Sequence, residues 1–308
     1  MLRRILLTPL EVRKLESLRE FLSRSGGRCR VWRMKHFLLM IAVVMGQSVL
    51  VAAKTKGNAA LNGTQRPEVI KAMRKIHAGF KGTRGYVAQF GDSITYSMAF
   101  WSPLGWDDPQ RFLTIDDGLP KIPTKGRWRD TIKGQRNKGS KFANYSGWRV
   151  GNLLKTIDVV LARDEPESAI IMIGTNDISG GRVPVGYRAN LEQVIDKCLK
   201  AHCVPILNTI PPRRGREKAV GEINQVIRNI ASKQSLPLVD YYADCLRTCP
   251  GNTWDGTIIS KDGVHPSGGK TNLYSAINLK TSGYALRNWV NFLVLRRLHF
   301  RVFEHQPE

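Results

Sequence analysis

Three short segments of the sequence carry side-chain types used in nucleophilic catalysis. They are GDSIT at 91–95, GTND at 174–177 and DGVH at 262–265. A serine hydroxyl such as that of Ser93 becomes a strong nucleophile when a base removes its proton. A histidine such as His265 acts as that base when a carboxylate orients its ring, and Asp262 lies only three residues earlier. These residues predict serine-dependent acyl transfer.

Apolar runs and amphipathic stretches alternate along the chain. Strand-like runs lie at 85–90, 142–145, 168–173, 204–210 and 236–242, and helical patterns lie at 67–80, 148–162, 187–201, 219–232 and 282–303. This alternation is typical of an α/β protein with a central parallel sheet, here of about five strands, covered on both faces. Ligands bind beyond the carboxyl ends of such strands. Short loops would therefore bring Ser93 and His265 to the same edge of the sheet.

The chain resembles the SGNH hydrolases, also called GDSL esterases and lipases, in four segments that occur in the family's order. GDS at 91–93 is similar to the first block of the family, and Ser146-Gly147 within NYSGWRVGNLL is similar to the second. GTND is similar to the third block and DGVH to the fifth, and the likeness spans 85–266. The first block departs from GDSL at Ile94, an apolar change. Each segment alone also suits an ordinary turn, but the ordered combination favours catalysis.

The resemblance implies a three-layer α/β/α, flavodoxin-like sandwich and a role for each matched residue. Ser93 would be the nucleophile and His265 the base, with Asp262 orienting the base. The oxyanion hole would consist of the backbone N–H groups of Ser93 and Gly147 and the side-chain amide of Asn176. We expect no cofactor and no metal, because this chemistry requires neither and no histidine pair has the spacing of metal ligands.

An insertion at about 99–141 separates the first two blocks, with 53 residues between Ser93 and Gly147. Its later part, 121–141, has eight Lys or Arg and only one acid, Asp130. Aromatic faces beside cations suit sugar rings and anionic groups. Three insertion residues are therefore predicted to bind substrate: Trp101, Trp106 and Trp128. The alternative is a solvated basic loop whose Trp side chains pack on the body of the protein.

The composition is that of a strongly basic globular protein. Of 308 residues, 48 are Lys or Arg and 25 are Asp or Glu, a net charge of +23, and 42% are hydrophobic, which excludes a disordered chain. Residues 54–308 hold 38 basic and 22 acidic residues and keep a charge of +16. This charge favours an anionic ligand or surface. Because no nucleic-acid-binding motif occurs, we expect no nucleic acid partner.

Residues 1–53 are predicted to be a leader that precedes a single hydrolase domain at 54–308. An uncharged run at 37–53 follows four basic residues and ends in small ones, as in a signal peptide. The run has 17 residues, fewer than most membrane-spanning helices, so cleavage and export are favoured over an anchor that would attach the protein to a membrane. A start at Met34 would give a compact signal sequence. We expect an extracytoplasmic protein.

Four cysteines follow the leader, and their even number predicts two disulfides in an exported protein. They are Cys198, Cys203, Cys245 and Cys249. Their spacing does not decide the pairing, and buried free thiols are the alternative.

These observations together predict a secreted serine esterase that removes short acyl groups, most simply acetyl, from a carbohydrate. Two alternatives stay open. A lipid esterase or lysophospholipase of the same family would prefer long-chain over acetyl esters. A noncatalytic carbohydrate-binding protein would hydrolyse neither.

Overall fold

Four parallel strands form the sheet in the described part of the chain. The structure is a computed structural model, and it describes residues 66–113, 118–122 and 127–304, without the side chains of 127 and 128. The strands follow the order β1-β2-β3-β4 across the sheet. Their bounds are β1 (Thr83–Gly91), β2 (Pro166–Met172), β3 (Val204–Asn208) and β4 (Leu238–Val239). The α/β class with a parallel sheet is confirmed.

The strands are buried because helices cover both faces of the sheet. All seven residues of β2 are buried, as are the last five of β1. In the register of the sheet, Ala88 lies opposite Ala169, and Leu207 lies opposite Leu238. A strand enclosed on both faces has no solvent side, which explains why the sequence shows continuous apolar runs instead of alternation.

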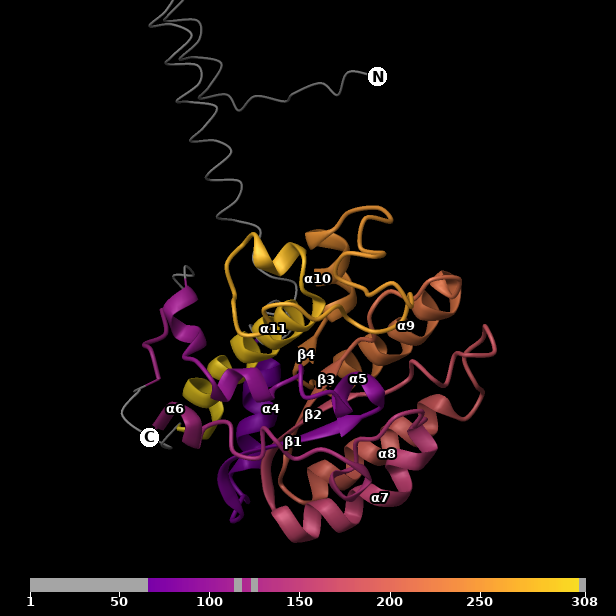
Figure 1. Cartoon of the computed structure of the whole chain (residues 1–308). Helices are drawn as coiled ribbons and strands as arrows, with labels where there is room; N and C mark the ends of the chain where they lie inside the picture. The colour runs from indigo at the N-terminus through magenta and orange to yellow at the C-terminus, as the bar shows by residue number, and fades with distance from the viewer. Residues whose placement is uncertain (1–65, 114–117, 123–126, 305–308) are drawn as a thin grey trace, which may run out of the picture. The chain divides into compact units, whose positions relative to one another are not determined.

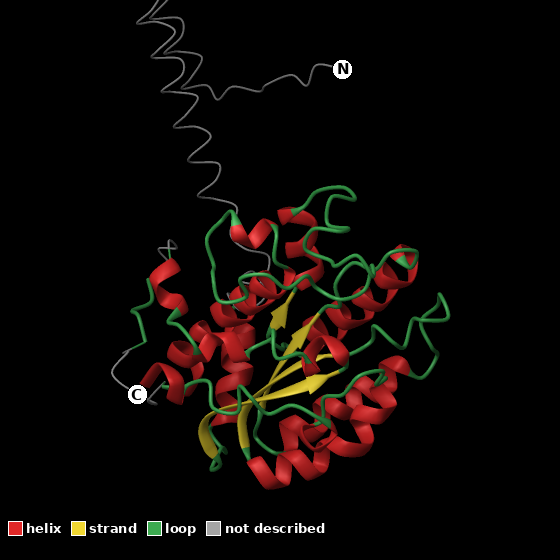
Figure 2. Cartoon of the chain, in the orientation of Figure 1, coloured by secondary structure: helices red, strands yellow, loops and turns green. Residues whose placement is uncertain are grey.

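Helices α7, α8 and α9 pack beside one another on one face of the sheet, and α4 and α11 lie on the other (Figures 1 and 2). The described α-helices are α4 (Pro67–His77), α5 (Ser93–Tyr96), α6 (Arg127–Asp130), α7 (Val150–Asp164), α8 (Tyr187–Lys200), α9 (Glu217–Lys233), α10 (Tyr241–Thr248) and α11 (Gly283–Leu298). A π-helical turn at His299–Phe303 follows α11. Short 3₁₀ helices lie at Ser102–Gly105, Pro109–Phe112, Ser140–Phe142 and Asn278–Lys280.

The helices form where apolar residues recur at the helical period. In α7, Leu153, Ile157, Val160 and Leu161 are buried along one stripe, which packs toward the sheet. Helix α11 differs, because it is buried almost all round. It contacts the insertion on its outer side, where the backbone N–H of Trp101 donates to the side-chain oxygen of Asn288.

The segment 142–145, expected to be a fifth strand, is not one. Gly91 N donates to Ala143 O at 3.1 Å, and Tyr145 N donates to Gly91 O at 3.3 Å, so the segment lies beside the end of β1. However, a 3₁₀ helix occupies Ser140–Phe142, and Ala143 has a left-handed φ of 57°. This conformation interrupts the extended backbone that a strand requires. The described sheet therefore has four strands.

The four cysteines are buried free thiols, so the two predicted disulfides are not formed in this structure.

The predicted leader at 1–53 and the predicted start at Met34 lie outside the described residues. Within the described ranges, no helix is both long enough and apolar enough to cross a membrane. The described residues of the hydrolase region belong to one compact unit.

Candidate active site

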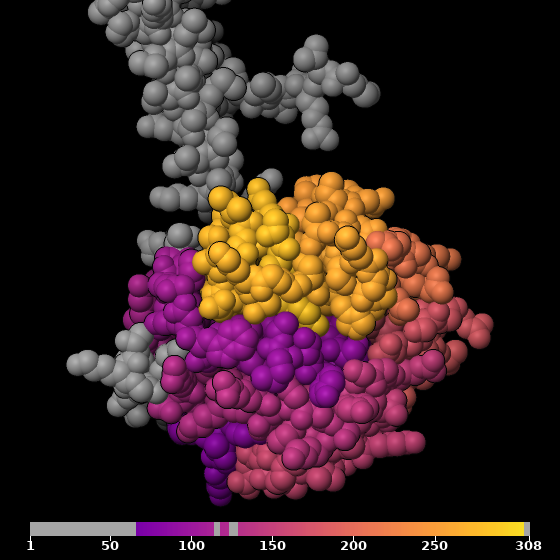
Figure 3. Space-filling view, in the orientation of Figure 1, coloured from indigo at the N-terminus to yellow at the C-terminus, as the bar shows by residue number. Residues whose placement is uncertain are grey.

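Ser93 lies at the junction between β1 and α5. The strand ends at Gly91 and the helix begins at Ser93, while Asp92 caps the helix by accepting a hydrogen bond from Ile94 N at 3.0 Å. A Cβ atom at Gly91 would lie 2.2 Å from the backbone oxygen of Met172, so only glycine fits beside β2 here. The segment that contains α5 lies on the face shown in Figure 3. The turn thus holds Ser93, which is partly exposed, at the carboxyl edge of the sheet.

A chain of hydrogen bonds joins the three residues predicted to form the triad. Ser93 Oγ lies 2.9 Å from His265 Nε2, and His265 Nδ1 lies 2.6 Å from Asp262 Oδ2. The carboxylate accepts the proton on Nδ1, which leaves Nε2 as the acceptor of the Ser93 hydroxyl. Ser93 and His265 are 172 residues apart in sequence. The structure therefore brings all three residues together in the order that base-assisted attack by serine requires.

Asp262 is held in its charged form by hydrogen bonds from its own loop. Burial opposes ionisation, but hydrogen bonds from Ser260 Oγ, the His265 ring and the backbone N–H groups of Val264 and His265 outweigh it and hold the pKa of Asp262 below its usual range. The Ser260 bond is 2.7 Å long. Ser260 was not identified from the sequence, although its place two residues before Asp262 is typical of such a local bond. The carboxylate is therefore ionised at neutral pH and accepts the hydrogen bond from His265 Nδ1 in its charged form.

The loops that contain Gly147 and Asn176 are bound to one another. Asn176 Nδ2 donates to Trp148 O at 3.0 Å, and Asp177 accepts from Val150 N at the start of α7 at 3.2 Å. The Asn176 amide has a second N–H, which makes no hydrogen bond within the described residues. Gly147 has a φ of 77°, a left-handed conformation that suits glycine. The two predicted oxyanion donors thus lie on adjoining loops.

Two buried carboxyl groups lie behind the site. Burial raises the pKa of Asp92 to about 6, although the Ile94 N–H and the charge of Arg287 act in the opposite direction. Burial also raises the pKa of Asp177 to about 6, and the charge of Asp92 adds to this rise. Both groups therefore change charge close to neutral pH.

Two cations that the sequence did not indicate, the buried Arg287 and the partly buried Lys138, hold the segment after Ser93. Arg287 Nη1 donates to Ile94 O at 2.8 Å and Nη2 donates to Thr95 Oγ1 at 3.0 Å, with the guanidinium 3.5 Å from the centre of the Phe100 ring. Burial lowers the pKa of Arg287 to about 10. Lys138 Nζ donates to Thr95 O at 2.8 Å. No sequence signal links residues on α11 and in the insertion to α5, because only folding brings them together.

The structure contradicts the prediction that Trp101 binds substrate. Its side chain is 0% exposed and lies in the core, so no ring face is available to a ligand. Trp106 is 51% exposed and stays a candidate. The side chain of Trp128 lies outside the described part of the chain. Lys138 is also enclosed, so the basic part of the insertion does not face water throughout.

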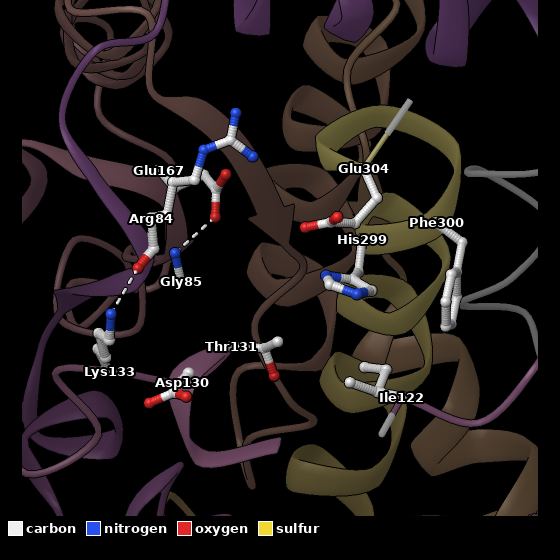
Figure 4. A pocket seen from close by; sticks show the side chains of 10 residues that line it. All are labelled: Arg84, Gly85, Ile122, Asp130, Thr131, Lys133, Glu167, His299, Phe300 and Glu304. Carbon is white, nitrogen blue, oxygen red and sulfur yellow. Dashed lines mark hydrogen bonds between the residues drawn. The ribbon is translucent and has the colours of Figure 1, made fainter. Parts of the chain in front are cut away.

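A separate cavity of about 430 Å³ lies at the opposite end of the strands (Figure 4). It lies beside Gly85 near the start of β1 and Glu167 near the start of β2, whereas the triad follows the carboxyl ends. The carboxylate of Glu167 already accepts a hydrogen bond from Gly85 N at 2.7 Å and is hydrogen-bonded to His77 Nε2 at 2.9 Å.

In the described ranges, no group of three His, Cys, Asp or Glu side chains is placed to hold a metal ion.

The parallel sheet and the hydrogen-bonded Ser, His and Asp at its carboxyl edge are those of a serine hydrolase with an α/β fold. A model of the GDSL-like lipase/acylhydrolase family matches residues 90–268. The chain therefore belongs to this family, and it is a hydrolase that acts on ester bonds.

Solved structures that are similar to this chain include several esterases and lipases. A lipase/acylhydrolase from Enterococcus faecalis is 22% identical, with 72% of this chain and 99% of that chain covered and a TM-score of 0.47. A GDSL-like lipase from Bacteroides thetaiotaomicron VPI-5482 is 16% identical, with 74% and 97% covered and a TM-score of 0.47. The acetyl xylan esterase AlAXEase is 20% identical, with 67% and 98% covered and a TM-score of 0.46. A comparison with curated proteins found no match.

Proposed function

We propose that the protein is a secreted serine esterase that removes short acyl groups, most simply acetyl, from a carbohydrate through an acyl-enzyme intermediate. The proposed catalytic mechanism rests on one observation, the chain of hydrogen bonds through the triad. Ser93 Oγ lies 2.9 Å from His265 Nε2, and His265 Nδ1 lies 2.6 Å from Asp262 Oδ2. Hydrogen bonds of this length place the base within reach of the proton it removes.

In the first step, Ser93 Oγ attacks the ester carbonyl carbon while its proton moves to His265 Nε2. The carbonyl oxygen becomes an oxyanion, which accepts hydrogen bonds from the N–H groups of Ser93 and Gly147 and from Asn176 Nδ2. The tetrahedral intermediate collapses, the bond to the alcohol oxygen breaks, and His265 returns the proton to that oxygen. The products of this step are the free alcohol and acylated Ser93.

In the second step, water attacks the acyl group on Ser93 and gives a proton to His265 Nε2. The same donors hold the second oxyanion, and its collapse releases the carboxylic acid as Ser93 Oγ regains the proton. Asp262 stays ionised throughout, since its hydrogen bonds keep its pKa below the usual range. Its charge stabilises the imidazolium that forms in both steps.

The choice of a carbohydrate ester rests on surface chemistry. Trp106, which is exposed, offers a ring face in the insertion, and the chain outside the leader carries a charge of +16. Aromatic faces stack on sugar rings, and cationic side chains attract acidic sugars.

Export is proposed from the predicted leader at 1–53. Sequencing the amino terminus of the mature protein from a native host would test it. A mature chain that still begins at residue 1 or at Met34 contradicts cleavage.

The direct test of the catalytic proposal is hydrolysis of p-nitrophenyl acetate and p-nitrophenyl palmitate by the wild-type chain and by Ser93→Ala. We expect acetate ester turnover that Ser93→Ala reduces by at least about 10³-fold, with little activity on palmitate. Ser102→Ala, which removes a buried hydroxyl outside the triad, is the matched control. Higher turnover of palmitate supports the lipid esterase instead. A folded protein with no Ser93-dependent turnover contradicts the catalytic proposal.

A further inference from the structure

Three aromatic side chains adjoin the residues of the candidate active site and contact one another. The ring centres of Tyr96 and Tyr145 are 5.3 Å apart, and those of Tyr145 and Trp148 are 6.3 Å apart. We call this group the aromatic surface. Its rings are tilted by 54° and 58°, so they do not form one flat stack.

The backbone connects the aromatic surface directly to the catalytic elements. Tyr96 is the last residue of α5, the helix that begins at Ser93. Tyr145 N donates to Gly91 O, at the end of β1, at 3.3 Å. Trp148 O accepts the hydrogen bond from Asn176 Nδ2, and Gly147 precedes it in sequence. The rings therefore come from the two segments that contain the nucleophile and the oxyanion donors.

These rings are open to solvent. Tyr96 is 38% exposed and Tyr145 is 45% exposed, and Trp148 is partly exposed. Neither tyrosine hydroxyl makes a hydrogen bond within the described residues. Contiguous apolar patches rimmed by polar groups occur at ligand-binding and protein-binding surfaces. Here both apolar faces and free hydroxyls are available to a ligand beside Ser93.

We propose that the aromatic surface binds the sugar ring whose ester is cleaved, a proposal that rests on the esterase function above. A pyranose ring presents C–H groups on its face and hydroxyls at its rim, which match the faces and hydroxyls of tyrosine. A long acyl chain would instead require an enclosed apolar cavity that removes most of its surface from water. An open surface with polar rims fits the alcohol part of the ester better than a fatty acyl part.

The position of the surface limits its effect to one half of the reaction. The sugar is the leaving group, so it is in contact with the enzyme while Ser93 is acylated and departs before water attacks. Replacing the rings should reduce kcat/KM for a sugar ester and leave hydrolysis of the acetyl-enzyme unchanged. A purely structural role of the rings would disturb both half-reactions and every substrate alike.

The kinetic test compares acetylated xylotetraose with ethyl acetate, whose leaving group has no ring. The variants are Tyr96→Ala, Tyr145→Ala and the double variant, with Tyr145→Trp as the conservative replacement that keeps a ring. We expect kcat/KM for acetylated xylotetraose to fall about tenfold for each alanine variant, with no change for ethyl acetate and recovery in Tyr145→Trp. Val159→Ala on α7 is the control, because it removes an exposed apolar side chain that belongs neither to the aromatic surface nor to the predicted binding residues.

A binding measurement separates the surface from catalysis. In a Ser93→Ala background, isothermal titration calorimetry with acetylated xylotetraose should show binding that Tyr145→Ala weakens about tenfold. Equal losses on the sugar ester and ethyl acetate overturn the proposal, as does unchanged kcat/KM for the sugar ester or the absence of binding. If the wild-type chain shows no Ser93-dependent hydrolysis of ethyl acetate, the esterase function itself has failed, whatever the titration shows.

Discussion

At the residue scale, the side-chain amide of Asn176 is predicted to have two roles. One N–H of Nδ2 donates to Trp148 O at 3.0 Å and holds the loop, and we propose that the other donates to the oxyanion. Because the oxyanion exists only during the reaction, Asn176→Ala should lower kcat about 10²–10³-fold and change KM little. Steady-state kinetics with p-nitrophenyl acetate checks this, with Asn229→Ala on α9 as the control. Full activity of Asn176→Ala would exclude its amide from the oxyanion hole.

The buried carboxyl of Asp92 predicts a pH dependence of stability. Its folded-state pKa of about 6 lies above the ordinary 3.8, so the folded protein binds this proton more tightly than the unfolded chain. The resulting stability is present below pH 3.8 and is lost as the pH rises through about 6. The loss is on the order of 3 kcal/mol, since each unit of pKa corresponds to about 1.4 kcal/mol.

Asp92→Asn tests this dependence, because asparagine keeps an oxygen to accept from Ile94 N and cannot ionise. We expect the variant to become more stable relative to wild type as the pH rises from 4 to 8. Urea unfolding at several pH values in this range measures the difference. Asp196→Asn, at an exposed position on α8, is the control and should show little pH-dependent difference. Parallel stability curves for wild type and Asp92→Asn would contradict the prediction.

At the scale of elements, the junction between β1 and α5 depends on the close approach of β2. A Cβ atom on Gly91 would lie 2.2 Å from Met172 O and 2.4 Å from Thr95 Oγ1. Gly91→Ala must therefore displace either the strand or the helix that contains Ser93, at a cost of about 1–3 kcal/mol in the free energy of unfolding, with loss of activity. Denaturant unfolding and p-nitrophenyl acetate turnover measure both effects.

Gly221→Ala provides the control within another element. Gly221 lies inside α9, and a Cβ there meets nothing within 4 Å. Alanine restricts the unfolded chain and favours the helix, so this variant should be more stable by about 0.5–1 kcal/mol and fully active. Equal behaviour of the two alanine variants would show that the packing of β1 against β2 does not limit position 91.

The charge of the whole molecule predicts the effect of salt on polymeric substrates. Residues 54–308 carry a net charge of +16, which attracts polyanions at long range, and salt weakens this attraction because the Debye length is only about 8 Å at 0.15 M ionic strength. For an acetylated polyuronate, kcat/KM should fall several-fold as sodium chloride rises from about 0.02 to about 0.5 M. Over this range the electrostatic attraction becomes short-ranged. Ethyl acetate, which is neutral, is the control. Salt-independent turnover of the polyuronate would show that the net positive charge does not attract the substrate.

The helices and strands were largely predictable because their apolar residues recur at regular intervals. Residues 187–201 were expected to be helical, and α8 occupies Tyr187–Lys200. The region 236–242 was predicted less well, since β4 has two residues and α10 already begins at Tyr241. Asp240 caps that helix by accepting from Ala243 N, a local bond that ended the strand earlier than its apolar pattern indicated.

What the sequence alone determined is the family, the sheet with its helices, and the types of residue at the strand ends. These follow from local order, since a strand followed by GDS, GTND or DGVH is visible without coordinates. Whether a side chain is buried depends on the tertiary structure: Trp101 lies in the core, whereas Tyr96 and Tyr145 are exposed. The tertiary structure also places Arg287 against the segment after Ser93, 193 residues away from Ile94 in sequence. Burial and long-range contacts depend on how elements pack in three dimensions, which no local spacing specifies.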